Sequence, residues 1–126
     1  PYKNRNKLVK AFSVDAAKEF KDNSLDFVYI DSNHEYSHVV ADISLWHKKV
    51  KVGGIVSGHD YILRKRAGYL MHVPYALEGW CRSYDIRPLF ILGTKEMREG
   101  KLRDSTRSWF YIKEPVEIVP AKPLEY

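Results

Sequence analysis

The chain has 126 residues, of which 44% are hydrophobic and 29% are charged, and its formal net charge is +5. This composition is that of one globular domain with a modest but sufficient core, and no apolar run approaches the roughly 18 residues that span a membrane. Cys81 is the single cysteine, which excludes an internal disulfide and favours a reducing compartment, so we expect a cytoplasmic protein.

The first third of the chain predicts a strand, a helix and a second strand. Residues 8–12 form an apolar run that suits a strand. Ser13 can cap the helix that follows, and Asp15 favours its first turn. Residues 26–31 contain a short run of β-branched and aromatic side chains between two aspartates, which predicts a strand covered on both faces.

The next segment predicts a helix and a third strand. Ser37 can cap a helix whose apolar side chains recur at three- and four-residue spacing. The members of this stripe are Val39, Val40, Ile43, Trp46 and Val50. The Gly53-Gly54 pair then leads into a strand over residues 54–59. Strand, helix and strand make one βαβ unit, so the first three strands should be parallel.

The second half of the chain has a looser pattern. Residues 62–73 lack a clear periodicity, and Pro74 can occupy the first turn of a helix over residues 75–83. Strands are expected at residues 87–92 and 108–113. Because no helix-length apolar stripe separates them, the last strand should be antiparallel to its neighbour. The fold class is therefore α/β, a single domain with a mostly parallel sheet and a C-terminal antiparallel strand.

Ionisable side chains follow two of the predicted parallel strands. Asp31 comes directly after the strand at residues 26–31, with His34 three residues later. His59 and Asp60 end the strand at residues 54–59. Ligands of open α/β sheets bind outside the carboxyl ends of the strands, so these four side chains should cluster there.

The combination of motifs resembles the C-terminal half of a class I S-adenosylmethionine-dependent methyltransferase. It is most similar to the branch of macrocin-type O-methyltransferases and cephalosporin-hydroxylase-like proteins. The matching residues are Asp31-Ser32-Asn33-His34-Glu35-Tyr36, Asp42, Trp46, Gly53-Gly54, Gly58-His59-Asp60 and Ser108-Trp109. The resemblance implies a partial Rossmann-like sheet and methyl transfer to a small hydroxylated acceptor. It also implies S-adenosylmethionine as donor and a divalent metal such as Mg²⁺ or Mn²⁺.

The resemblance also implies roles for individual residues. Asp31 would bind the metal or act near the acceptor hydroxyl, with Asp60 and His59 as further metal ligands. His34 would be the general base, because imidazole can take a proton at neutral pH. Ser13 and Asp31 would contact the cofactor. The structural alternatives remain open: Asp31 and Ser13 as capping residues, Asp60 as a turn residue, and His34 as a loop histidine bonded to backbone.

The sequence departs from the family in its donor site. The family has a glycine-rich loop after its first strand and an acidic residue ending its second strand, and neither is found here. Gly53-Gly54 precedes a strand, so this pair is not a cofactor loop. We therefore expect a fragment, or a truncated product, whose isolated form is inactive and binds S-adenosylmethionine weakly or not at all.

Two other functions compete with methyl transfer. A non-catalytic α/β fragment could form a homodimer through its exposed sheet edge, because unpaired edges invite association. A nucleic-acid-binding module is supported only by charge, such as that of Arg64-Lys65-Arg66. The basic residues are not interleaved with aromatic side chains as in a stacking platform, so nucleic acid is an unlikely partner. A membrane partner is not expected.

Overall fold

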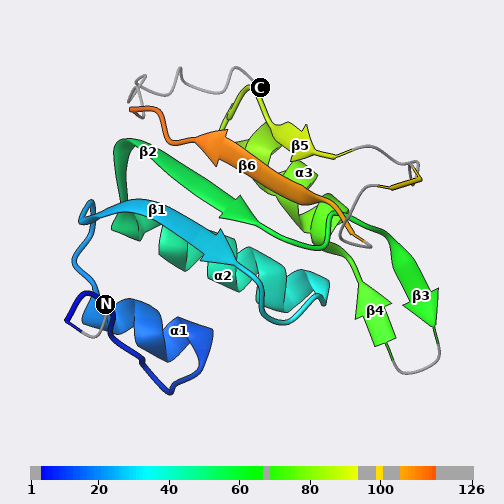
Figure 1. Cartoon of the computed structure of the whole chain (residues 1–126). Helices are drawn as coiled ribbons and strands as arrows, with labels where there is room; N and C mark the ends of the chain where they lie inside the picture. The colour runs from blue at the N-terminus through cyan, green and yellow to red at the C-terminus, as the bar shows by residue number, and fades with distance from the viewer. Residues whose placement is uncertain (1–3, 67–68, 94–98, 101–105, 116–126) are drawn as a thin grey trace, which may run out of the picture.

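The computed structural model describes residues 4–66, 69–93, 99–100 and 106–115 (Figure 1). The elements in chain order are α1 (Ser13–Ala16), the 3-10 helix η1 (Ala17–Glu19), β1 (Leu25–Ile30), α2 (Tyr36–Lys49), β2 (Val50–Gly58), β3 (Arg64–Arg66), β4 (Tyr69–Met71), α3 (Val73–Ser83), β5 (Phe90–Leu92) and β6 (Ser108–Ile112). Among the described residues, no helix is long and apolar enough to cross a membrane.

The main sheet has the strand order β1-β2-β6-β5. β1 and β2 are parallel, and β6 is antiparallel to both β2 and β5. In the described sheet β1, β2 and β5 thus run in one direction and β6 runs against them. The mixed α/β class and the antiparallel C-terminal strand are confirmed. β3 and β4 form a separate antiparallel hairpin.

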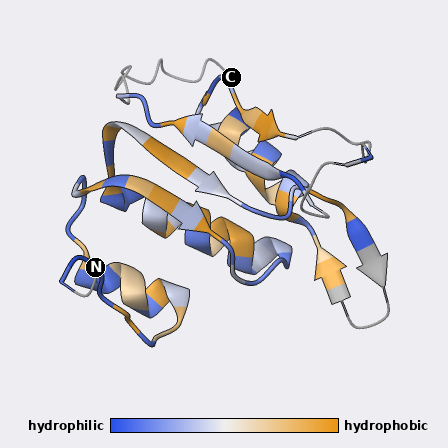
Figure 2. Cartoon of the chain, viewed as in Figure 1, coloured by the Kyte–Doolittle hydropathy of each residue, from blue (hydrophilic) through white to orange (hydrophobic). Residues whose placement is uncertain are grey.

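Helices α2 and α3 cover one face of the main sheet (Figure 1). Strand and helix residues meet there in one apolar core. Figure 2 shows hydrophobic residues both in the strands of the main sheet and in the helices. Its best-buried side chains are Trp109, Tyr111, Ile43, Leu77, Val50 and Val56. The predicted stripe of α2 is largely confirmed, because Val39 and Ile43 are buried and Val40 packs against the core. Val50, the last predicted member, is buried too but is the first residue of β2.

The N-terminal part of the chain differs from the prediction. Residues 8–12 form no strand, and the side chains at its two ends, Leu8 and Phe12, are 95% and 82% exposed. A strand needs a neighbour and a buried face, and among the described residues this run has neither. The prediction of three parallel strands is therefore wrong within the described sheet. Ser13 does not cap α1, because it is the first residue of the helix and Phe12 holds the N-cap position. Its hydroxyl instead accepts a hydrogen bond from the indole Nε1 of Trp46 at 2.8 Å.

Apart from the β3–β4 hairpin, which was not predicted, the remaining elements agree with the prediction to within a few residues. α2 begins at Tyr36 with Glu35 as its N-cap residue, so Ser37 lies inside the helix. α3 begins at Val73 and carries the proline in its first turn, as predicted. β6 is confirmed, whereas only the last three residues of the predicted strand at 87–92 form β5.

Lys113 attaches the end of β6 to the C-terminus of α2. Its ammonium group donates hydrogen bonds to the carbonyl oxygens of Val50 (2.7 Å) and His47 (3.0 Å) and to Oδ1 of Asn23 (2.9 Å). The two carbonyl acceptors lie at the end of α2, where a helix presents carbonyls that have no partner inside the helix. The loss of hydration lowers the pKa of Lys113. This buried lysine therefore holds the C-terminal end of α2 against the sheet.

Candidate active site

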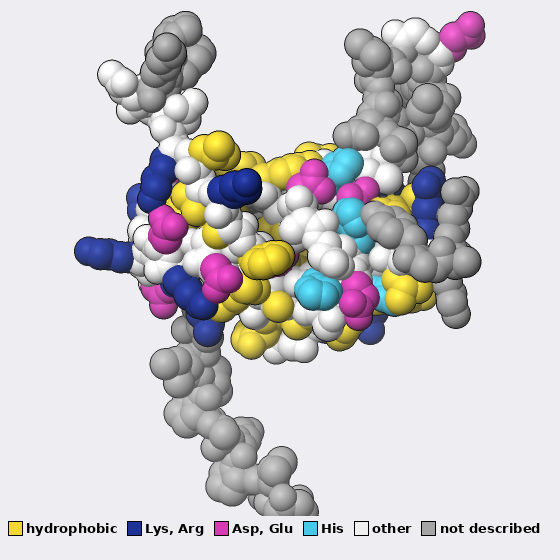
Figure 3. Space-filling view, turned by 90° about the horizontal axis from the view of Figure 1, so that it is seen from below, with side chains coloured by type: hydrophobic (Ala, Val, Ile, Leu, Met, Phe, Trp, Pro, Cys, Tyr) yellow, Lys and Arg dark blue, Asp and Glu magenta, His cyan; other side chains and the backbone are white. Residues whose placement is uncertain are grey.

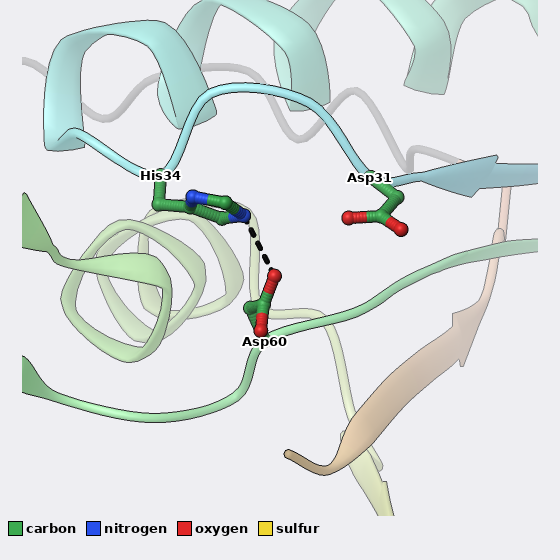
Figure 4. A group of neighbouring side chains, drawn as sticks. All are labelled: Asp31, His34 and Asp60. Carbon is green, nitrogen blue, oxygen red and sulfur yellow. Dashed lines mark ion pairs between the residues drawn. The ribbon is translucent and has the colours of Figure 1, made fainter. Parts of the chain in front are cut away.

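The candidate site lies at one end of the sheet, where the parallel strands β1 and β2 both end. Ile30 pairs with Gly58 in the register of β1 and β2, so the residues that follow them leave the sheet side by side. Asp31 follows β1, and Asp60 follows β2 after one intervening residue. Figure 4 shows both carboxylates and the ring of His34 directed toward a common space.

The three side chains in this space are in close contact. Nε2 of His34 lies 2.6 Å from Oδ2 of Asp60. These two side chains are 20% and 13% exposed, whereas Asp31 is exposed. One nitrogen or oxygen atom from each of Asp31, His34 and Asp60 lies within 4.8 Å of the corresponding atoms of the other two. Figure 3 shows histidine and acidic side chains gathered in one part of the surface.

The loop that carries Asp31 and His34 is held from three sides. Ser32 donates its hydroxyl proton to the buried carboxylate of Asp42 on α2. Oδ1 of Asn33 accepts a hydrogen bond from the amide of Glu35 at 2.8 Å. The carbonyl of His34 accepts one from the amide of His72, which precedes α3, at 2.8 Å. The loop geometry is therefore set before any ligand binds.

The turn after β2 places Asp60 toward His34. Gly58 permits the close approach, because a Cβ atom there would lie 2.5 Å from the carbonyl oxygen of Ile30 and 2.6 Å from the ring of Trp109. Asp60 has a φ of 57°, a left-handed conformation that aspartate tolerates better than most residues. The chain thus turns sharply and directs the carboxylate back across the end of the sheet.

His59 occupies the side of the site that faces β6. Its Nδ1 lies 3.5 Å from Oδ2 of Asp60, and its Nε2 lies 3.1 Å from the hydroxyl of Thr106. Its carbonyl accepts a hydrogen bond from Nε1 of Trp109 at 3.0 Å. The prediction placed His59 with Asp31 and Asp60 as metal ligands. In the described residues it is His34 that completes the group with the two carboxylates.

A small pocket opens beside this cluster. Its lining combines the site residues with apolar side chains from the sheet and both helices. The lining residues are Ile30, Asp31, Ser32, Asn33, His34, Val39, His59, Val73 and Trp109. The predicted clustering of Asp31, His34, His59 and Asp60 at one end of the sheet is thus what the structure shows.

Ser13, the other predicted cofactor contact, lies away from the cluster. Its hydrogen-bond partner Trp46 is ten residues after Tyr36 on α2. At 1.5 Å per residue this separation is about 15 Å along the helix axis. The structure therefore does not bring Ser13 to the loop that carries Asp31.

Two reactive side chains of the core lie outside the site. Burial raises the pKa of the Cys81 thiol to about 11, so the thiol is protonated at neutral pH and is a poor nucleophile. Burial lowers the pKa of His47 to about 4. Its Nδ1 lies 3.0 Å from the hydroxyl of Tyr111, which also accepts a hydrogen bond from Nε1 of Trp80. Both side chains therefore belong to the core and not to the candidate site.

The chain was compared with protein families. A family model described as a methyltransferase domain matches residues 1–61. The match supports a methyltransferase family. The matched segment contains β1, α2 and β2, and it ends directly after Asp60. Comparison with curated proteins gives no match.

Sequence reasoning missed several residues of the site. Thr106 and His72 come from segments without a clear pattern, and their contacts arise only when β6 and α3 pack against the strand ends. Asp42 was not missed: it is among the matching residues named from the sequence, and as a buried aspartate on α2 it needs a polar partner. That partner, Ser32, lies ten residues earlier in the chain.

Proposed function

We propose that the chain supplies the acceptor side of an S-adenosylmethionine-dependent O-methyltransferase that acts on a small hydroxylated compound. The macrocin-type and cephalosporin-hydroxylase-like branch is the proposed relative. The observation that carries the proposal is the contact of His34 with Asp60 beside Asp31, at the end of two parallel strands. The methyltransferase match over residues 1–61 agrees with it.

His34 is the proposed general base. Asp60 lies 2.6 Å from Nε2 and can stabilise the positive charge that the ring gains on taking a proton. A positioned base of this kind contributes about 10²–10⁴-fold to a rate.

The donor atoms at the site fit a small divalent cation. Asp31 and Asp60 offer carboxylate oxygens, and their separation of no more than 4.8 Å allows both to reach one ion at about 2.0–2.6 Å. Bound there, a cation such as Mg²⁺ or Mn²⁺ would draw the acceptor oxygen into place and favour its deprotonation. Histidine as a third ligand would favour Mn²⁺ over Mg²⁺.

A neutral imidazole ring has one nitrogen lone pair that can bind a metal or take up a proton. His34 therefore cannot be both a metal ligand and the base. We assign His34 to the proton and the two carboxylates to the cation. This assignment makes a distinction that can be measured. Loss of the His34 side chain should abolish transfer and leave cation binding largely intact, whereas loss of Asp31 should weaken both.

The described residues offer no comparable site for the methyl donor, S-adenosylmethionine. The loop between β1 and α2 has no glycine, and the Gly53-Gly54 pair lies within β2. None of the described strand-to-helix loops therefore has the glycine-rich turn that would bind this donor. The proposal leaves the donor site outside the elements described here, with Asp31 as the proposed contact to the donor on this side.

The function can be tested by joining residues 1–126 behind the glycine-loop half of a methyltransferase of the same family. We expect this fusion to transfer labelled methyl groups from S-adenosylmethionine to hydroxyl groups in a panel of small compounds. His34→Gln in the fusion should lower the rate at least about 100-fold, as for loss of a general base. His38→Gln is the matched control, because this exposed histidine of α2 lies outside the site.

The controls separate folding from chemistry. Each fusion must bind S-adenosylmethionine in calorimetry and unfold cooperatively before its rate is compared. A folded fusion that binds the donor yet methylates no hydroxyl compound would contradict the proposed function. Equal rates for His34→Gln and His38→Gln would show that His34 is not the base.

A further inference from the structure

Positive charge collects in the part of the chain that leaves the site after Asp60. Residues 61–77 contain three Lys or Arg side chains and no acidic side chain. Arg64, the first of the three, is exposed at the start of β3, four residues after Asp60. The chain thus passes within a few residues from the carboxylates of the site to a basic segment.

A second arginine reaches the same end of the sheet from the start of β6 (Figure 1). The carbonyl of Arg107 accepts a hydrogen bond from the amide of Tyr61 at 2.9 Å. The hydroxyl of the preceding residue, Thr106, lies 3.1 Å from Nε2 of His59. Arg107 therefore lies beside the turn that carries Asp60. Because β2 separates β6 from β1 in the sheet, this arginine is on the side of the site away from β1.

The guanidinium group of Arg107 is held in place without an acidic partner. Its central carbon lies over the ring of Tyr61, 5.4 Å from the ring centroid. That ring is itself fixed, because it packs against the core and its hydroxyl donates a hydrogen bond to Oε1 of Glu78 at 3.1 Å. Arg107 is only partly exposed, and it forms no ion pair with a carboxylate of the described residues. An aromatic ring offers no lone pair, so N–H donors of the guanidinium remain for a ligand.

We propose that Arg107 and Arg64 bind an acidic group of the acceptor, which is therefore a hydroxylated carboxylic acid or phosphate ester. The inference rests on the proposed methyl transfer and names its substrate class. A guanidinium group can bind two oxygens of a carboxylate or phosphate at once. The carboxylates of Asp31 and Asp60 repel the acidic end of such an acceptor, and the arginines attract it. The two sides of the site thus orient the acceptor, with its hydroxyl group toward His34.

A purely structural role is the competing explanation for Arg107. In that case the guanidinium group only holds Tyr61 against the start of β6. Loss of the side chain would then affect acidic and neutral acceptors equally. If Arg107 binds the acid, its loss weakens the binding of acidic compounds and leaves that of their neutral counterparts unchanged.

NMR titration of the isotope-labelled 126-residue chain with matched acidic and neutral compounds tests the inference. The pairs are gallate with gallamide, for a carboxylate, and glycerol phosphate with glycerol, for a phosphate. The signal of the side-chain Nε–H of Arg107 reports contact with the acid. We expect at least one acid to shift this signal and to bind about tenfold or more tightly than its neutral counterpart, since a hydrogen bond between charged groups changes an affinity by about this factor.

Three variants identify the group that recognises the acid. Arg107→Gln should remove the preference for the acid, and Arg107→Lys should keep only part of it, because an ammonium group lacks the planar fork. The matched control is Arg87→Gln, since this exposed arginine precedes β5 at the opposite end of the sheet. It should keep the full preference. Thermal unfolding shows whether each variant is folded, and Arg64→Gln, at an exposed position, provides the comparison if Arg107→Gln unfolds.

The fusion that tests the proposed function separates the two proposals. With the same pairs, Arg107→Gln in the fusion should raise KM for the acid about tenfold and leave kcat unchanged. A fusion that methylates hydroxyl groups without preferring either acid contradicts this inference alone. A fusion that methylates nothing contradicts the proposed function, and the titration still decides whether the acid is bound. The inference is overturned if neither acid binds at up to about 10 mM, or if Arg107→Gln and Arg87→Gln keep the same preference.

Discussion

The buried histidine of α2 should make the stability of the protein depend on pH. Desolvation, assisted by the charge of Lys113, lowers the pKa of His47 from 6.5 to about 4. The neutral ring is held by the hydroxyl of Tyr111, 3.0 Å from Nδ1. Trp80 can only donate to that hydroxyl, so Tyr111 is left to donate its own proton to His47. The folded state therefore stabilises the uncharged imidazole.

The sign and size of the effect follow from this pKa difference. Between pH 6.5 and 4 the unfolded chain binds the proton and the folded chain does not, so the free energy of unfolding falls as the pH falls. A shift from 6.5 to about 4 corresponds to about 3 kcal/mol in total. About 2 kcal/mol of this is lost between pH 7 and pH 5. Below pH 4 the group adds no further loss.

Urea unfolding at pH 7 and pH 5 measures the effect. Carboxylates titrate in the same range, so the relevant quantity is the difference between the wild type and His47→Gln, which lacks the titrating ring. We expect the wild type to lose about 2 kcal/mol more than His47→Gln over this interval. His38→Gln, which removes an exposed histidine, should behave as the wild type. Equal pH slopes for wild type and His47→Gln would refute the reasoning.

Two further predictions concern the cap of α2 and the donor. Lys113→Met leaves three oxygen atoms without their ammonium partner and should lower the free energy of unfolding by about 3 kcal/mol. The control Lys51→Met removes an exposed ion pair with Asp26 and should lower it by less than about 1 kcal/mol in the same urea titration. The 126-residue chain alone should give no micromolar S-adenosylmethionine binding in titration calorimetry, because none of its described strand-to-helix loops has a glycine-rich turn. Micromolar binding would mean that the donor site is completed in another way.

The parts of the fold that could be predicted are those in which one local pattern determines one element. The stripe of α2 contains Val39 and Ile43 at helical spacing, and both are buried as expected. The runs that became β1, β2 and β6 were found within a few residues of their observed ends. Two parallel strands must end on the same side, so the meeting of Asp31 with Asp60 could also be predicted.

The parts that could not be predicted depend on contacts distant in the sequence. The run at residues 8–12 has strand-forming residues, but whether it pairs depends on a neighbour that local pattern cannot specify. The β3–β4 hairpin has strands of three residues, too short for an alternating pattern to be recognised. Whether His34 or His59 groups with the carboxylates of Asp31 and Asp60 depends on the left-handed turn at Asp60 and on the packing of Trp109 against Gly58.

The central claim is that the ends of β1 and β2 form a reactive site in which two carboxylates hold a cation and His34 holds a proton. Electron paramagnetic resonance titration of Mn²⁺ into the 126-residue chain tests it directly. Asp31→Asn and Asp60→Asn should each weaken Mn²⁺ binding at least about tenfold. His34→Gln and the exposed control Asp26→Asn should bind as the wild type does. A chain that binds no Mn²⁺, or binds it equally well without Asp31, would contradict the claim.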